Sequence, residues 1–312
     1  MSEDTQHEEE ASRGILILIC SVLAVLLLSL SSSFVYGAEV GCIEVYDGKS
    51  IDEAAASQLR PAGFRPVAGM CKRAYIRGTI TRGDYEKVRA LYRASHPLLS
   101  VFALASEGGS VAEAMQIGNL FRNYLISANA PNRINDEPGF LTGTVDKPVC
   151  VGPECVCASA CALIWFGAVD RFGVIGLHRP RIDDPDFKGM PPADAAKLYR
   201  QVLDQMERYL AGMEAPRPLI DAMLETASSS IRWIKYDRDG LSRPPSYAEW
   251  ADASCGSVSD TEFSRGADLS IRKYVNNQTL TNSDELFLAK FVEHGRCNLC
   301  LRFGAVERMP LP

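Results

Sequence analysis

The chain has 312 residues, of which 46% are hydrophobic and 23% are charged, and its formal net charge at pH 7 is −6. This length allows one large domain or two modest ones, because a domain usually contains roughly 100–200 residues. The acidic balance and the lack of any long basic run argue against a nucleic-acid-binding protein, which needs a cationic face.

The N-terminus carries an apolar run from Ile15 to Leu30, after a polar and acidic head. The small residues Gly37 and Ala38 follow it, as at the cleavage point of a secretory signal peptide. Extended to Val35, the run approaches the ~20 residues that a membrane-spanning helix needs. Residues 1–38 are therefore predicted to be a signal peptide or a membrane anchor. The preferred interpretation is a single anchor in the cell membrane with the domain outside the cytoplasm; the alternative is a periplasmic or secreted protein.

The cysteines support export, because disulfides persist in oxidising compartments. Ten are present, and nine follow the apolar run, so at least one thiol stays free or pairs between chains. Cys42 and Cys71 form a plausible staple. A cluster lies further along: Cys150, Cys155, Cys157 and Cys161. Disulfides are predicted there rather than a metal site, since no histidine accompanies the cluster and its spacing is not that of zinc sites. A disulfide is likewise favoured for Cys297-Asn298-Leu299-Cys300. No metal and no cofactor are expected.

The first half of the chain alternates between strand and helix patterns after a predicted linker over residues 39–69. Apolar alternation indicates strands, and apolar residues at a spacing of three or four indicate helices. The predicted elements are a strand over 73–80, a helix over 84–92, a buried strand over 98–105, a glycine turn at 108–109 and a helix over 111–125 with Ser110 as its cap.

The second half continues the alternation. Its predicted elements are a loop over 127–147, a strand over 148–156, a buried helix over 158–166, a strand over 172–177 and helices over 192–213 and 218–226. A capping-box pattern follows at Ser246 and Glu249. This order predicts an α/β domain over residues 70–255 and a small C-terminal extension over 256–312.

Three short motifs hold the residue types of a serine hydrolase. Ser159 lies in the small-residue run Cys157-Ala158-Ser159-Ala160-Cys161, and His178 ends an apolar strand-like run. A serine hydroxyl needs such a neighbouring base to become nucleophilic. Gly108 and Gly109 can expose backbone N–H groups toward a developing oxyanion. These residues predict serine hydrolysis.

The motifs resemble those of the Clp protease proteolytic subunit and its exported relatives, within the Clp/crotonase superfamily. The resemblance covers about 180 residues and rests on four segments in order: Ile76-Arg77-Gly78-Thr79-Ile80, Ser106-Glu107-Gly108-Gly109-Ser110, Ala158-Ser159-Ala160 and Gly176-Leu177-His178-Arg179-Pro180. It implies stacked βαβ units and peptide hydrolysis, often in homo-oligomeric rings.

Carried over by position, the resemblance makes Ser159 the nucleophile and His178 the general base. The backbone N–H groups of Gly109 (or Gly108) and Ala160 become the oxyanion hole. The acid of the triad stays open: one alignment places Ser229 there, another points to Asp237 or Asp239, and a third alternative is that no acid is present. The implied substrate is a peptide or an unfolded protein, hydrolysed without ATP because ATP is absent outside the cytoplasm.

Two other interpretations remain open. The first is a catalytically inactive, membrane-associated interaction protein that keeps the Clp fold, favoured by the short interval from Ser159 to His178 and by the unassigned acid. The second is acyl-CoA chemistry as in crotonase relatives, which export disfavours because CoA is cytoplasmic.

Overall fold

The computed structural model describes residues 37–48, 67–96, 98–132, 139–141, 148–181, 189–235 and 247–256, with shorter stretches at 270, 273–274, 276–290, 293–294 and 297. All of them belong to the unit Gly37–Pro312. The predicted signal peptide or anchor therefore lies almost wholly outside the described residues. Among those that are described, no helix has the length and apolar character to cross a membrane.

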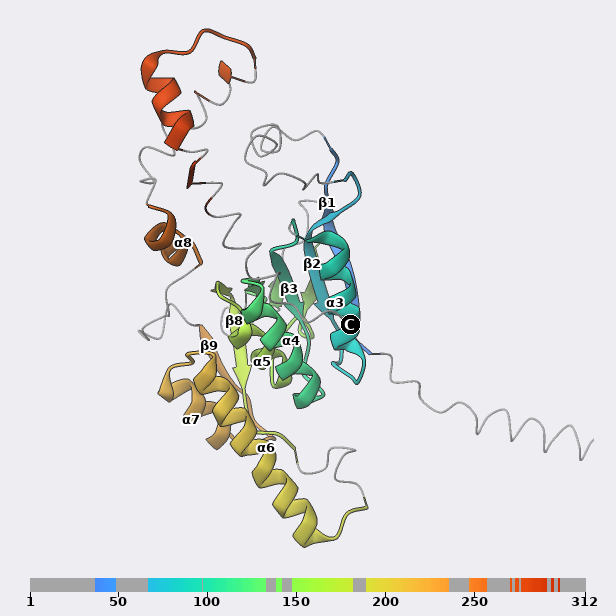
Figure 1. Ribbon diagram of the computed structural model, residues 1–312. Helices are drawn as coiled ribbons and strands as arrows, with labels where there is room; N and C mark the ends of the chain where they lie inside the picture. The colour runs from blue at the N-terminus through green and yellow to red at the C-terminus, as the bar shows by residue number, and fades with distance from the viewer. Residues whose placement is uncertain are drawn as a thin grey trace, which may run out of the picture. The chain divides into compact units, whose positions relative to one another are not determined.

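The centre of the fold is a five-stranded sheet in the order β1-β2-β3-β4-β7 (Figure 1). Its members are β1 (Glu39–Val45), β2 (Cys71–Arg77), β3 (Val101–Ala105), β4 (Ser127–Asn129) and β7 (Arg171–Phe172). Strands β2, β3, β4 and β7 run parallel, and β1 pairs antiparallel with β2 at the edge. The parallel strands joined by helices confirm the predicted α/β class.

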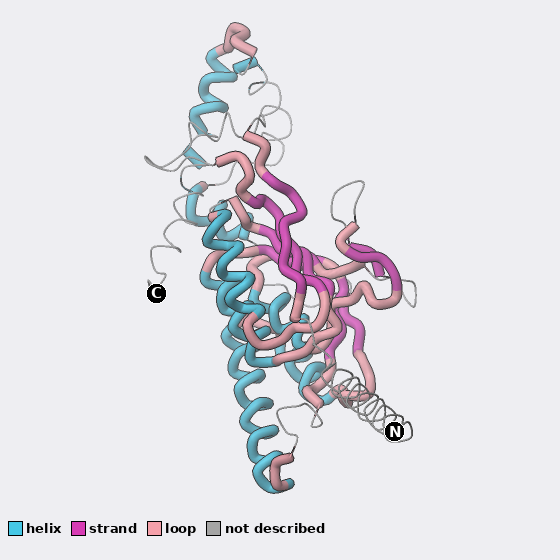
Figure 2. Tube along the Cα trace, turned by 90° about the vertical axis from the view of Figure 1, so that its right-hand side faces the viewer, coloured by secondary structure: helices cyan, strands magenta, loops and turns pink. Residues whose placement is uncertain are grey.

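Three helices cover one face of the sheet, and Figure 2 shows the helices gathered on one side of the strands. They are α3 (Asp84–Ser95), α4 (Val111–Asn123) and α5 (Ala160–Gly167). Ser110 caps α4 as predicted, because its side chain accepts a hydrogen bond from the Glu113 N–H. All eight residues of α5 are buried, as expected for a helix that is apolar on every side.

Helices α4 and α5 approach closely through two glycines. A Cβ added at Gly167 would lie 2.3 Å from the backbone oxygen of Gly118. The absence of a side chain at Gly167, the last residue of α5, lets the end of α5 lie close against α4.

A second, smaller core lies on the opposite face of β3. Side chains alternate between the faces of a strand: Phe102 and Leu104 belong to the helix-side core, whereas Ala103 and Ala105 pack with Leu141 and other residues. That second face is covered by the antiparallel hairpin of β5 (Gly139–Leu141) and β6 (Cys150–Gly152).

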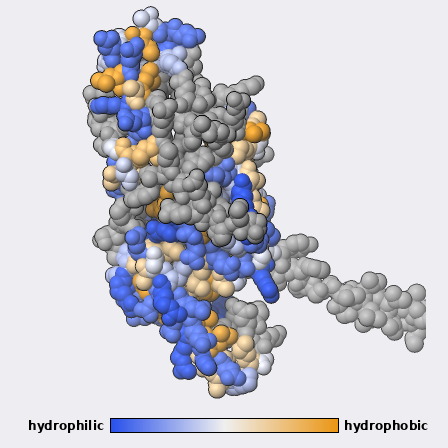
Figure 3. Space-filling view, in the orientation of Figure 1, coloured by the Kyte–Doolittle hydropathy of each residue, from blue (hydrophilic) through white to orange (hydrophobic). Residues whose placement is uncertain are grey.

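The remaining elements of the α/β domain follow the serine motif. Strand β8 (Val174–Leu177) pairs antiparallel with β9 (Arg232–Lys235), and between them lie α6 (Pro192–Gly212) and α7 (Arg217–Glu225). Both helices were predicted. Their exposed surface is predominantly hydrophilic, as the lower part of Figure 3 shows.

Three predicted elements differ from the structure. Glu39–Val45, which was expected within a linker, forms β1, and the predicted loop over 127–147 contains the short strands β4 and β5. The predicted strand over 172–177 is two strands, β7 and β8, because Gly173 interrupts it with a φ of 92°. The four short strands β4, β5, β7 and β8 owe their conformation to neighbours in space, since two to four residues carry too little pattern of their own.

The C-terminal part contains α8 (Tyr247–Cys255) and a helix over 282–290. Asp284 has a buried carboxylate that accepts hydrogen bonds from Ser270 Oγ, Thr281 N and Oγ1, and Lys273 Nζ. The side-chain hydrogen bond from Lys273 and those from Thr281 and Ser270 hold the pKa of Asp284 far below its usual range. Thr281 and Asp284 form a capping arrangement at the helix start.

Four disulfides are present in the described part of the chain. They join Cys42 to Cys71, Cys150 to Cys155, Cys157 to Cys161 and Cys255 to Cys297. The Cys42–Cys71 staple and the disulfides of the central cluster are confirmed, and the Cys297 partner is long-range. Four disulfides are typical of proteins from oxidising, extracytoplasmic compartments.

Candidate functional site

Ser159 lies in a strained turn immediately before α5. Its φ of 57° and ψ of −124° are unusual for a residue with a side chain, and such conformations persist only where the surroundings enforce them. Here two neighbouring segments of the chain hold Ser159 in this conformation. Cys157 forms a parallel bridge with Ser106, Ala158 forms one with Gly176, and the Ser159 N–H donates to the Gly176 carbonyl at 2.9 Å.

The glycine turn after β3 lies directly against Ser159. A Cβ added at Gly108 would be 2.6 Å from the Ser159 Cβ and 3.0 Å from its Oγ, so the serine side chain occupies the space over this glycine. At Gly109 an added Cβ would be 2.1 Å from the Ile80 oxygen. Both glycines have a positive φ, 119° and 132°. The turn therefore requires glycine twice, for two different neighbours.

The backbone amides of Gly109 and Ala160 have no acceptor among the described residues, and neither does that of Glu107 in the same turn. Hydrogen bonds from Ile80 N to Gly108 O and from Ser110 N to Ile80 O flank Gly109, so its own amide faces away from Ile80. Ala160 begins α5, where an N–H has no intrahelical acceptor. The Gly108 N–H, in contrast, donates to Ser106 Oγ at 3.1 Å. Of the two predicted glycines, Gly109 is the one with a free donor.

His178 follows β8 and is only 7% exposed. Its Nδ1 lies 2.8 Å from the Arg179 carbonyl oxygen. A carbonyl can only accept, so Nδ1 carries the hydrogen, and in the neutral imidazole Nε2 then holds the lone pair that a general base needs. Ser159 and His178 come from adjacent bridged segments, but these two described side chains share no hydrogen bond.

The described residues provide no acid that is hydrogen-bonded to His178 as the third group of a triad would be. No carboxylate among them is hydrogen-bonded to His178, and its Nδ1 is occupied by the Arg179 carbonyl. Asp237 and Asp239 lie outside the described residues. Ser229 is exposed after α7 and has no hydrogen bond to the imidazole.

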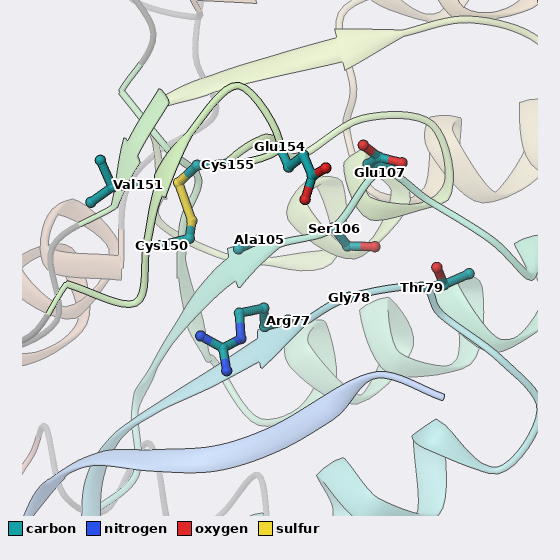
Figure 4. A pocket seen from close by; sticks show the side chains of 10 residues that line it. All are labelled: Arg77, Gly78, Thr79, Ala105, Ser106, Glu107, Cys150, Val151, Glu154 and Cys155. Atoms are coloured by element: carbon teal, nitrogen blue, oxygen red, sulfur yellow. A yellow bond between two sulfur atoms is a disulfide. The ribbon is translucent and has the colours of Figure 1, made fainter. Parts of the chain in front are cut away.

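Two features of the site were not predicted. The Cys157–Cys161 disulfide closes a five-residue ring with Ser159 at its centre, and both cysteines are buried. A pocket of about 470 Å³ opens beside the glycine turn, and its lining includes Glu107 and Glu154 (Figure 4). Of the pocket residues, Glu107 is the one that the sequence could have singled out, because it lies inside the glycine motif. The described residues contain no cluster of three or more side chains suited to a metal ion.

Comparisons with known proteins give limited support. No protein-family model matches the chain, and no curated protein matches its sequence. Among solved structures, a mutant of ClpP1 from Listeria monocytogenes is similar, with 14% identity, coverage of 53% of this chain and 84% of that chain, and a TM-score of 0.36. A likeness at this TM-score carries no argument for fold or function, so the proposed function depends on the geometry of the site.

Proposed function

We propose that this chain is a serine-type peptidase that acts without ATP. The observation that carries the proposal is the conformation of Ser159: a half-buried serine at positive φ, pressed against Gly108, at the start of a buried helix. Strained backbone of this kind concentrates at catalytic centres. The unpaired amides of Gly109 and Ala160 and the neighbouring imidazole are the other parts that acyl transfer requires.

The proposed mechanism has two steps. In the first, Ser159 Oγ attacks the scissile carbonyl carbon, its proton passes to His178 Nε2, and the amides of Gly109 and Ala160 bind the oxyanion. His178 then gives the proton to the leaving amine, and an acyl-serine remains. In the second step, water attacks the ester with the same base, which releases the acid product and restores the hydroxyl.

At His178 Nδ1, the Arg179 carbonyl holds the position that the acid of a triad would occupy. In a triad the acid fixes the imidazole tautomer and stabilises the imidazolium ion. A carbonyl fixes the tautomer equally well, but it carries no full charge. We therefore expect turnover slower than that of a full Ser-His-Asp triad. The Ser159–His178 hydrogen bond would form in the substrate complex, where such contacts tighten.

Labelling with a fluorophosphonate probe tests this proposal. The wild-type chain should form a covalent adduct at Ser159, and Ser159→Ala should abolish it. His178→Gln should slow labelling by at least about 100-fold, the usual contribution of a general base. His294→Gln, a change in the C-terminal part, is the matched control and should label normally. A wild-type chain that stays unlabelled would falsify the proposal.

The alternative is a catalytically inactive interaction protein on the same fold. The lack of a Ser159–His178 hydrogen bond between these described side chains is the observation that favours it. It predicts no probe labelling and an unchanged capacity to bind partners in the Ser159→Ala variant.

We also propose that the domain works outside the cytoplasm, either held by the apolar segment 15–30 or released from it. The four disulfides support an oxidising location. Mass spectrometry of the unreduced protein from its native compartment should show all four linkages, and N-terminal sequencing would distinguish a retained anchor from a cleaved signal. Fully reduced cysteines in that material would contradict the assignment.

A further inference from the structure

The pocket beside the glycine turn is large enough to hold an amino-acid side chain. Its volume of about 470 Å³ falls within the roughly 300–1,000 Å³ typical of ligand pockets. The ends of β2 and β3 form its floor, and the hairpin strand β6 with the turn after it forms a wall (Figure 4).

The pocket and the serine turn share two chain segments. Glu107 lines the pocket and directly precedes Gly108, against which Ser159 packs. Cys155 lines it as well and lies two residues before Cys157, which is bridged to Ser106. A peptide with one side chain in this pocket would therefore place a neighbouring peptide bond within reach of Ser159.

The pocket has unbalanced negative charge at one end. Glu107 and Glu154 are exposed, and neither carboxylate has an ion pair or a hydrogen bond within the described chain. Figure 4 shows both at the end of the pocket near Ser106 and Thr79, with the Arg77 side chain at the opposite end.

Arg77 does not neutralise that charge, because its guanidinium is already engaged. Its Nη2 and Nε contact Glu39 Oε2 at 2.5 and 3.2 Å, and its Nη1 donates to the Val149 carbonyl at 3.1 Å. Hydrogen bonds from Tyr75 and then Arg77 lower the pKa of Glu39, so this partner stays ionised at neutral pH. Within the part of the chain that the structure describes, the two pocket glutamates are left without a cation paired to them.

Part of the lining is apolar. Ala105 and the Cys150–Cys155 disulfide line the pocket, whereas the Val151 side chain lies on the other side of β6 (Figure 4). An apolar wall next to two carboxylates suits a side chain with an aliphatic stem and a cationic head, since lysine and arginine pack their methylene groups on apolar surface.

We propose that this pocket binds a lysine or arginine side chain of a peptide, with the cation at Glu107 and Glu154. The identity of the peptide as a substrate rests on the proposed function, but binding of the cationic side chain does not require hydrolysis. The two can therefore fail separately.

Binding to the non-hydrolysing Ser159→Ala chain tests the pocket. Fluorescence anisotropy would compare three labelled peptides that differ only in one central residue: lysine, glutamine or glutamate. Two exposed ion pairs should favour lysine over glutamate by roughly 10-fold at low salt. The preference should shrink as ionic strength rises, because exposed charges are screened.

Substitutions in the pocket assign the effect. Glu107→Gln with Glu154→Gln should remove the preference, and lysine at both positions should reverse it toward the glutamate peptide. The matched control is Glu225→Gln with Glu285→Gln, which changes the net charge equally at exposed sites elsewhere and should keep the preference. Equal binding of the three peptides, no binding at all, or a preference that survives the pocket substitutions would each overturn the proposal.

These results are independent of the labelling experiment. If the chain is labelled at Ser159 but shows no charge preference, the peptidase proposal stands and the pocket assignment is rejected. If it is never labelled but selects lysine peptides through Glu107 and Glu154, the pocket assignment stands and the peptidase proposal is rejected.

Discussion

Replacing Cys157 and Cys161 by alanine should slow the reaction of Ser159 with a fluorophosphonate probe. It should lower stability less than loss of the Cys42–Cys71 disulfide does. Both cysteines are buried, and their disulfide closes a ring of five residues around the strained serine. Release of the ring lets Ser159 relax from its φ of 57° toward ordinary conformations. Alanine is the appropriate replacement because it leaves no unpaired polar group in the interior.

The expected free energies distinguish a role of the Cys157–Cys161 disulfide in positioning Ser159 from a role in stabilising the fold. The loop-entropy relation gives about 2 kcal/mol for a five-residue ring and about 3.6 kcal/mol for the ring closed by Cys42 and Cys71, whose sequence separation is 29. A strained backbone residue stores about 1–3 kcal/mol. If the disulfide holds that strain at the reacting serine, its loss slows labelling by about 5- to 150-fold.

The assay is the rate of fluorophosphonate labelling, measured beside the thermal midpoint for two double variants. Cys42→Ala with Cys71→Ala should show the larger drop in midpoint and near-normal labelling of the folded protein. Cys157→Ala with Cys161→Ala should show the smaller drop in midpoint and the slower labelling. Wild-type labelling by the second variant, at a temperature where it is fully folded, would refute a positioning role for the disulfide.

Three further predictions concern the glycine turn, the C-terminal cap and the α5 contact. Gly109→Ala should destabilise the fold by at least about 2 kcal/mol, because strain at positive φ adds to a Cβ 2.1 Å from Ile80 O; Gly189→Ala, which has positive φ but open space, should cost less, and equal midpoints would contradict this. Because the pKa of Asp284 is lowered, its stabilisation should be present above the unfolded value of about 4 and be lost as pH falls through the lower folded value. Amide exchange of residues 282–290 should therefore rise in acid, and Asp284→Asn should remove that pH dependence; an identical profile in the variant would reject it. Tyr209→Phe deletes the 2.7 Å hydrogen bond to the Leu163 carbonyl and should cost about 1 kcal/mol in chemical denaturation, with no loss as the contrary result.

The long elements were predictable because each carries its own pattern. Helices α4 and α6 repeat apolar residues at helical spacing, and the Ser110 cap was legible from its position. Strand β4 could not be predicted, because Ser127-Ala128-Asn129 has the composition of a loop. It becomes a strand through its register with β3 on one side and β7 on the other.

The candidate site likewise has features that the sequence could predict and features that depend on the fold. Ser159, His178 and the glycine pair could be proposed from the sequence because their chemistry is local to short motifs. The pairing of Cys157 with Cys161 could not, because Cys150 and Cys155 lie close by and spacing alone does not choose among the pairings. The charge of the pocket depends on where the β5–β6 hairpin and the edge strand β1 lie. The contact between the Arg179 carbonyl and His178 depends on the direction of the backbone, which the residue types do not predict.

The serine turn holds its shape through bridges to Ser106 on one side and Gly176 on the other. These segments are distant along the chain, so the turn has no native geometry until both flanking portions have folded around it. If the chain is the exported peptidase proposed above, a nascent or translocating polypeptide would be inactive, and Ser159 would become reactive only once the domain is complete.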